Sequence, residues 1–286
     1  MTIKEKFQIL TGDILGGLNA SIITLPQALA FGVATGFGAS AGIWGAIILC
    51  LIAGILGTKV PMISGVTGPV AIVVASVMHA LNKDLNSVIF IIFLAGILQV
   101  ILSLTKLPEI VKYVPYPVIS GFMNGVGVII IIMQLNPLLG LSACSNTIES
   151  LETVFKSISM LNHQAFVIGI LTLCIVFFFP KRWNKYVPSQ ILALIICTLI
   201  SIKTDLNIAR ISEISVSLPS VSFPQTTLHD FITYFQYSVM LAVILSSESL
   251  LTGLVCTSVT KASVSPKRML AAQGLGNICC AMTGTL

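Results

Sequence analysis

The chain has 286 residues, of which 56% are hydrophobic and only 9% are charged, and its mean hydropathy is +1.01. Soluble domains carry about 25% charged residues, so this composition excludes an ordinary soluble domain and indicates a membrane protein. The net charge of +5 then belongs to loops and membrane topology and does not indicate nucleic-acid binding.

Apolar runs between polar breaks predict helical spans of about the length that a bilayer requires. They cover residues 14–32, 40–58, 62–80, 86–104, 115–139, 163–179, 187–202, 231–256 and 266–284. With residues 1–13 in the cytoplasm, only Lys83, Lys156, Lys203 and Arg210 of the 15 Lys and Arg residues lie outside. This distribution satisfies the positive-inside rule, so we expect a multi-pass protein with a cytoplasmic N-terminus.

The span 14–32 contains Pro26 and Gln27 near its middle. Pro26 removes a hydrogen-bond donor and is expected to bend the helix. The Gln27 amide can donate to an anion or accept from a neighbour. A single glutamine within a membrane is also common as a contact between helices, and the residue alone does not decide between these roles.

The span 62–80 is interrupted at its start, where residues 61–69 read PMISGVTGP. Proline and paired glycines disfavour a continuous helix through Gly68. Thr67 is a candidate N-cap, and Pro69 suits the first helical turn. We therefore expect an extended piece followed by a half-helix that begins within the membrane, with its positive dipole end available to an anion. The alternative is a helix that is only kinked for packing.

Glu248 is the only charged residue between positions 231 and 260. A carboxylate at the centre of the hydrocarbon layer costs at least ~2.5 kcal/mol and therefore usually faces a cavity, an ion or a partner. We interpret Glu248 as part of an ion or substrate pathway. A packing carboxylate satisfied by neighbouring hydroxyl groups is the alternative.

The seven cysteines show no CxxC pairing, and the three histidines are far apart. This pattern indicates neither a zinc site nor a disulfide framework. No nucleophile–base pair and no phosphate-binding loop is recognisable. We therefore expect neither an enzyme nor a cofactor.

Residues 20–32 align weakly with residues 241–253, and the alignment places Gln27 on Glu248. The second copy begins seven spans after the first. Because seven is odd, the second copy enters the membrane from the opposite side. This is the inverted repeat of many secondary transporters, which bind substrate near the midplane between broken helices.

The repeat predicts the organisation of the chain. A first transmembrane repeat covers residues 14–203, a loop on the outer side covers 204–230, and an incomplete second repeat covers 231–286. The counterpart of the interruption at 61–69 is expected just past Leu286.

Three ordered motifs resemble the SulP family of inorganic anion transporters, known in animals as the solute-carrier anion exchangers. GDILGGLNASIITLPQALAFGVATG is similar to the first transmembrane motif of that family, and MISGVTGPVAIVV to its third-helix motif. SESLLTGLVCTSVT followed by AAQGLGNI is similar to its eighth and ninth helices. The form of these motifs looks most like the bacterial branch that transports bicarbonate.

The resemblance implies an all-α membrane fold of two inverted repeats of seven segments, divided into core and gate, with a STAS domain that this sequence lacks. It also implies an anion site formed by the spans 14–32 and 62–80, with the residues Gln27, Thr67, Gly68 and Pro69. Sodium-coupled relatives carry Asp at the position of Glu248 and a threonine at that of Thr252. The resemblance therefore implies a cation site at this pair, for sodium or, because Glu replaces Asp, for a proton.

The leading hypothesis is secondary active transport of bicarbonate or sulfate by alternating access, coupled to Na⁺ or H⁺, in a bacterial inner membrane. Its partners are the inorganic anion, the bilayer and, as a further expectation, a second copy in a homodimer. One alternative is a non-transporting fragment of a split or frameshifted gene or of an incomplete record. Another keeps the fold but carries a dicarboxylate or a nucleobase.

Overall fold

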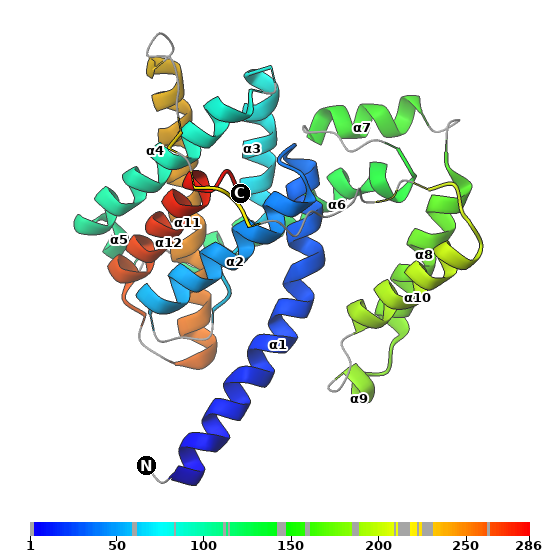
Figure 1. Cartoon of the computed structure of the whole chain (residues 1–286), viewed down its shortest axis with the longest axis horizontal. Helices are drawn as coiled ribbons and strands as arrows, with labels where there is room; N and C mark the ends of the chain where they lie inside the picture. The colour runs from blue at the N-terminus through cyan, green and yellow to red at the C-terminus, as the bar shows by residue number, and fades with distance from the viewer. Residues whose placement is uncertain are drawn as a thin grey trace. The chain divides into compact units, whose positions relative to one another are not determined.

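The computed structural model describes residues 3–58, 62–82, 84–110, 113, 115–141, 147–157, 161–184, 189–208, 210, 218–221, 223–224, 231–261 and 264–286. Throughout these residues the regular secondary structure is helical (Figure 1), which confirms the predicted all-α class. The helices are α1 (Ile3–Ala34), α2 (Ala39–Leu56), α3 (Gly68–Ala80), α4 (Leu85–Leu104), α5 (Leu107–Ile110), α6 (Tyr116–Leu138), α7 (Thr147–Lys156), α8 (His163–Phe178), α9 (Lys181–Asn184), α10 (Ser189–Lys203), α11 (Phe231–Thr260) and α12 (Pro266–Met282).

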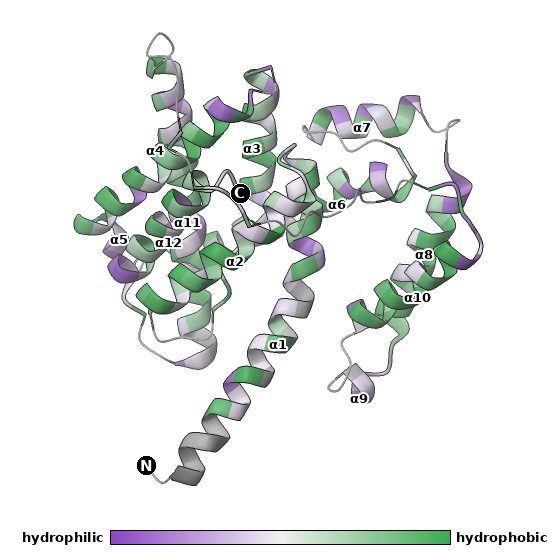
Figure 2. Cartoon of the chain, viewed as in Figure 1, coloured by the Kyte–Doolittle hydropathy of each residue, from purple (hydrophilic) through white to green (hydrophobic). Residues whose placement is uncertain are grey.

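Each predicted span coincides with a helix of the structure. Within the described residues, three helices are long and apolar enough to cross a membrane by themselves, namely α2, α4 and the part of α11 from Phe231 to Thr257. The helix α1 continues through Pro26 without interruption. Large apolar side chains such as Ile55 and Leu104 stay exposed, with 73% and 80% of their surface accessible. Figure 2 shows that α2 and α4 consist mostly of hydrophobic residues, as expected for helices that cross a membrane.

The chain divides into two compact units. The first unit comprises residues 1–27, 133–144 and 148–211, and the second comprises residues 28–132, 145–147 and 212–286. In the first unit α8 packs against α10. The second unit contains α2, α3, α4, α11 and α12, while α1 and α6 contribute to both units.

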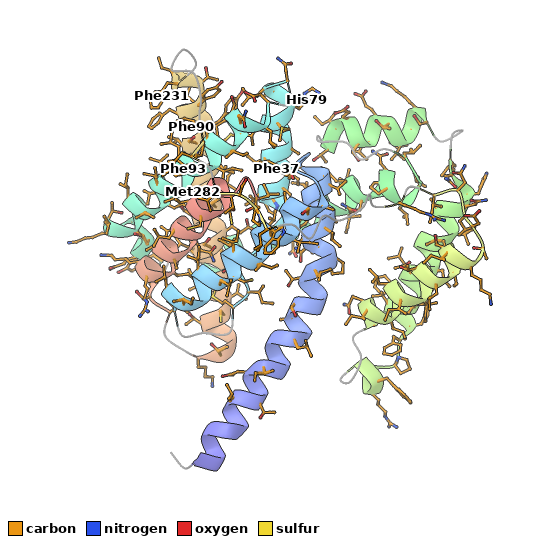
Figure 3. All side chains as sticks on the ribbon, in the orientation of Figure 1. Phe37, His79, Phe90, Phe93, Phe231 and Met282 are labelled. Carbon is orange, nitrogen blue, oxygen red and sulfur yellow. The ribbon has the colours of Figure 1, made fainter. Side chains whose placement is uncertain are left out.

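The second unit is built around α4, which contacts α3, α11 and α12. Its core is apolar, and Ile91 of α4 and Leu241 of α11 are almost completely buried there. Phe37, Phe90 and Phe93 pack against this core (Figure 3). The helix α12, which is distant from both of them in the sequence, packs against α4 and α2.

The predicted interruption of the third span is confirmed. Residues 62–67 are not helical, and α3 begins at Gly68 with Pro69 in its first turn. Thr67 is the N-cap residue, with φ −112° and ψ 160°. The alternative of a continuous kinked helix is therefore wrong for these residues, while Pro61 lies outside the described part of the chain.

One helix lies between the predicted spans 115–139 and 163–179, where the sequence predicted no element. The helix α7 is amphipathic and is anchored in the first unit, because the Asn136 side chain donates to the Ser150 hydroxyl over 3.0 Å. Its apolar residues Ile148 and Phe155 are exposed. The spacing of these residues is typical of one helix face, a signal that our interpretation of the sequence did not use.

Candidate functional site

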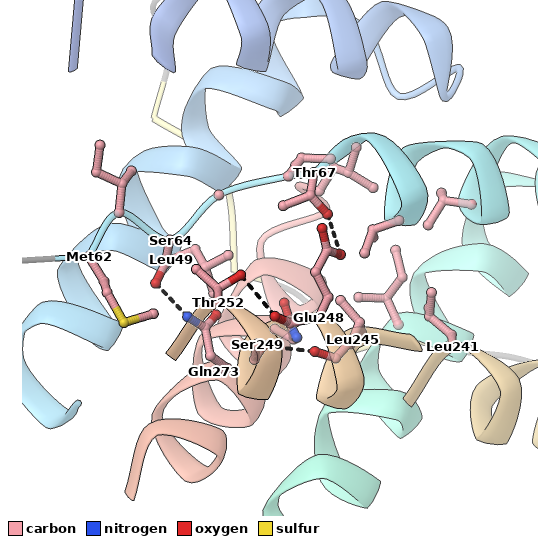
Figure 4. Close-up of a pocket in the computed structure, with 18 residues that line it drawn as sticks. Leu49, Met62, Ser64, Thr67, Leu241, Leu245, Glu248, Ser249, Thr252 and Gln273 are labelled. Atoms are coloured by element: carbon pink, nitrogen blue, oxygen red, sulfur yellow. Dashed lines mark hydrogen bonds between the residues drawn. The ribbon is translucent and has the colours of Figure 1, made fainter. Parts of the chain in front are cut away.

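A pocket opens in the second unit between the non-helical segment 62–67, α3 and α11, with further contributions from α2, α4 and α12 (Figure 4). Because backbone without helical hydrogen bonds is tolerated at membrane depth only where protein buries it or where it lines a cavity, the segment 62–67 belongs in such a place. We regard this pocket as the candidate site.

The N-terminus of α3 supplies a partial positive charge to the pocket. The first N–H groups of any helix have no acceptor within that helix, and the helix dipole adds to their positive potential. The first helical hydrogen bond of α3 runs from Ala71 N to Thr67 O over 2.9 Å. The Thr67 side chain does not cap the helix, so its hydroxyl is available for another partner.

The partner of the Thr67 hydroxyl is the side-chain carboxylate of Glu248. The Thr67 hydroxyl donates to Oε2 of Glu248 over 2.5 Å, although 181 positions separate the two residues. Figure 4 shows the two side chains pointing toward one another. Glu248 is half-buried on α11 and lines the same pocket. A negative charge near a helix N-terminus is electrostatically favourable, so the dipole of α3 helps to keep Glu248 in the apolar layer.

Thr252 also lines the pocket, one turn beyond Glu248. Its hydroxyl donates to the main-chain carbonyl oxygen of Glu248 over 2.9 Å. The Thr252 hydroxyl and the Glu248 carboxylate thus lie one turn apart on α11. Oxygen atoms of these kinds are the ligands that hard cations prefer, and whether a cation binds here stays a prediction.

The other predicted anion residues are placed differently. Gly68 and Pro69 form the first turn of α3 behind Thr67 and are not among the residues that line the pocket. Gln27 is exposed on α1, belongs to the first unit and does not line the pocket either. The structure therefore brings Thr67, Glu248 and Thr252 together, and the role of Gln27 stays a prediction.

Sequence reasoning assigned no role to three amides around the pocket. Gln273 and Asn277 of α12 line it. Gln273 Nε2 donates to the hydroxyl of Ser64 over 2.5 Å, and Asn277 Nδ2 donates to Oε1 of the fully buried Gln99 over 2.6 Å. The available signal was the same as for Glu248, namely polar side chains within apolar helices.

Comparisons with known proteins agree with this architecture. The model of the sulfate permease family matches residues 10–286. The bicarbonate transporter BicA of Synechocystis is 36% identical over 294 residues, which include 100% of this chain and 52% of that protein. BicA of Picosynechococcus is 34% identical, with 97% and 51% covered. The chain thus spans about half the length of these relatives.

A solved structure shares the fold. The transmembrane domain of a cyanobacterial bicarbonate transporter BicA superposes with a TM-score of 0.87 at 35% identity, covering 98% of this chain and 74% of that domain. This similarity confirms the predicted inverted-repeat transporter fold.

Proposed function

Because this chain belongs to the sulfate permease family, we propose that it serves in secondary active transport of a small inorganic anion, bicarbonate or sulfate, across a membrane. The observation that carries the proposal is the contact between Thr67 and Glu248 at the N-terminus of α3. Bicarbonate is favoured by the names of two relatives that share more than 30% identity with this chain. Sulfate is supported by the description of the family.

The geometry supports a coupling mechanism. An anion that approaches the N-terminus of α3 meets the negative charge of Glu248, which accepts a hydrogen bond from Thr67. Like charges at short distance in a medium of low dielectric constant repel strongly. A sodium ion at Glu248 and Thr252, or a proton on Glu248, removes this repulsion. Cation and anion then favour each other's binding, and this linkage is reciprocal.

Movement of core against gate would then expose the loaded site to each side of the membrane in turn. In alternating-access transporters one part of the fold rocks as a rigid body against another around the site. We place the protein in a bacterial inner membrane with its N-terminus in the cytoplasm, and retain the homodimer as part of this proposal.

The test is the variant Glu248→Gln in the full-length protein, reconstituted in vesicles. Coupling free energies of typically 1–3 kcal/mol correspond to about 5–150-fold changes, so we expect at least ~5-fold slower uptake of labelled anion and no dependence on the cation gradient. Glu152→Gln is the matched control, because Glu152 is exposed on α7 and pairs only with Lys156 among the described residues. Wild-type uptake with unchanged cation dependence in Glu248→Gln would remove this residue from the mechanism.

Uptake measurements in the same vesicles identify the substrate and the coupling ion. Uptake of labelled bicarbonate and of labelled sulfate is measured with a sodium gradient, with a proton gradient and with neither. Excess succinate or uracil is then added as competitor. Strong competition by either compound would overturn the assignment to a small inorganic anion.

A further inference from the structure

The non-helical segment 62–67 needs hydrogen-bond partners from outside itself. Polar backbone groups in an apolar layer are costly when they are unpaired. Two side-chain contacts with this segment meet at the buried Ser64. Cys50 Sγ of α2 donates to the Ser64 carbonyl oxygen over 2.7 Å. Gln273 Nε2 of α12 donates to the Ser64 hydroxyl over 2.5 Å, as Figure 4 shows.

Of these two contacts the one from Gln273 is the stronger, because a thiol is a weak donor whereas an amide is a good one. Gln273 also lines the pocket together with Ser64 and Thr67. Only two residues separate Ser64 from Thr67, so a fixed position for Ser64 restricts where the Thr67 hydroxyl can lie.

Packing on both sides determines where Gln273 itself lies. At the adjacent Gly274, α12 lies very close to α4: a Cβ atom added there would be 2.8 Å from the main-chain oxygen of Gly96. One turn further, Asn277 is hydrogen-bonded to Gln99 of α4. On the other side of α12, Gly276 packs against Leu49 of α2. A side chain on a helix held by packing on both sides is suited to orient a neighbouring segment that lacks helical hydrogen bonds.

We propose that Gln273 is a positioning residue for transport: its hydrogen bond to Ser64 holds the segment 62–67 so that the Thr67 hydroxyl and the N-terminus of α3 face the pocket. The proposal rests on the proposed function, since it assumes that an anion binds there. Gln273 itself need not touch the anion. Its loss should therefore weaken anion binding and leave the maximal rate of transport unchanged.

The experiment is a double-mutant cycle of Gln273→Met and Ser64→Ala in the full-length protein. Methionine is close to glutamine in size and cannot form the amide hydrogen bond. The net value of such a bond, about 0.5–1.5 kcal/mol, corresponds to a roughly 2–12-fold higher KM for the anion. Each single variant should show this rise at unchanged maximal rate, and the double variant should show no further rise, because both changes remove one and the same interaction. Gln164→Met in the first unit is the matched control.

Backbone hydrogen exchange, measured by mass spectrometry, gives a readout that does not depend on transport. We expect faster exchange in peptides covering 62–67 for Gln273→Met and Ser64→Ala, and unchanged exchange in α8. Unchanged exchange at 62–67, or KM effects that add in the double variant, would overturn the proposal. Faster exchange at 62–67 in a protein whose wild type takes up no anion would instead contradict the proposed function and leave the positioning contact in place.

Discussion

At the scale of single residues, Gly274 determines how closely α12 approaches α4. A Cβ atom there would lie 2.8 Å from the carbonyl oxygen of Gly96 and 2.9 Å from Cγ2 of Val100. Because the carbonyl oxygen belongs to the backbone of α4, it cannot rotate away as a side chain would. Close contacts between small residues are a common way to associate membrane helices. Here the contact also sets the position of the neighbouring Gln273.

Gly274→Ala should therefore destabilise the protein. Overpacking of a tight contact typically costs about 1–3 kcal/mol, so the thermal unfolding midpoint of the purified full-length protein should fall. Gly54→Ala in α2 is the control, because nothing lies within 4 Å of its added methyl group, and alanine favours a helix over glycine. Equal midpoints for the two variants would show that α12 and α4 do not need this close approach.

At the scale of secondary-structure elements, the start of α3 depends on a contact with α6. A Cβ atom at Gly68 would lie 2.5 Å from Cδ1 of Ile130, at the end of a flexible side chain. Gly68 is buried directly after the N-cap residue Thr67. A side chain at position 68 would displace the first turn of α3 and move the Thr67 hydroxyl away from Glu248. We therefore expect the site to be sensitive to substitution of Gly68 by a larger residue.

Gly68→Ala is expected to slow anion uptake, and the double variant Gly68→Ala/Ile130→Val is expected to recover part of it, because valine lacks the Cδ1 atom that the new methyl group would meet. Uptake into vesicles is compared at equal protein content, with Ile130→Val alone as the control. If the double variant is no faster than Gly68→Ala, the defect does not arise from the contact with α6.

At the scale of the whole molecule, the positive-inside distribution predicts on which side of the membrane each loop lies. The helix α4 has 20 residues, which at 1.5 Å per residue spans about 30 Å, the thickness of the hydrocarbon layer. Its two ends should therefore lie on opposite sides. Ala80, at the end of α3, belongs to the predicted outer side, and Lys106, before α5, to the cytoplasmic side.

Cysteine labelling tests this orientation. In a variant without the seven native cysteines, Ala80→Cys should react with a membrane-impermeant maleimide in intact cells. Lys106→Cys should react only after the cells are permeabilised. The reverse pattern would invert the topology, and labelling of both positions in intact cells would show that α4 does not span the membrane.

The sequence by itself determined the features that depend on neighbouring residues. A span needs a long apolar run because its backbone must be satisfied within one helix in lipid, and the structure has a helix at each predicted span. The same local chemistry located the interruption before α3, since residues 61–69 carry proline and paired glycines. It also singled out Glu248, because an isolated charge stands out in an apolar run whatever surrounds it.

Only the tertiary structure decided which side chains meet. The partner of Glu248 is Thr67, 181 positions away, and the partner of Gln273 is Ser64, 209 positions away. Such pairs depend on how each helix is rotated and shifted against its neighbours. For α12 and Gln273, the close contacts at Gly274 and Gly276 contribute to that placement. Helical periodicity describes one helix at a time and therefore does not identify partners on other helices. The pocket of the second unit is lined by Thr67, Glu248 and the amides of α12, and the role that the resemblance implied for Gln27 remains a prediction.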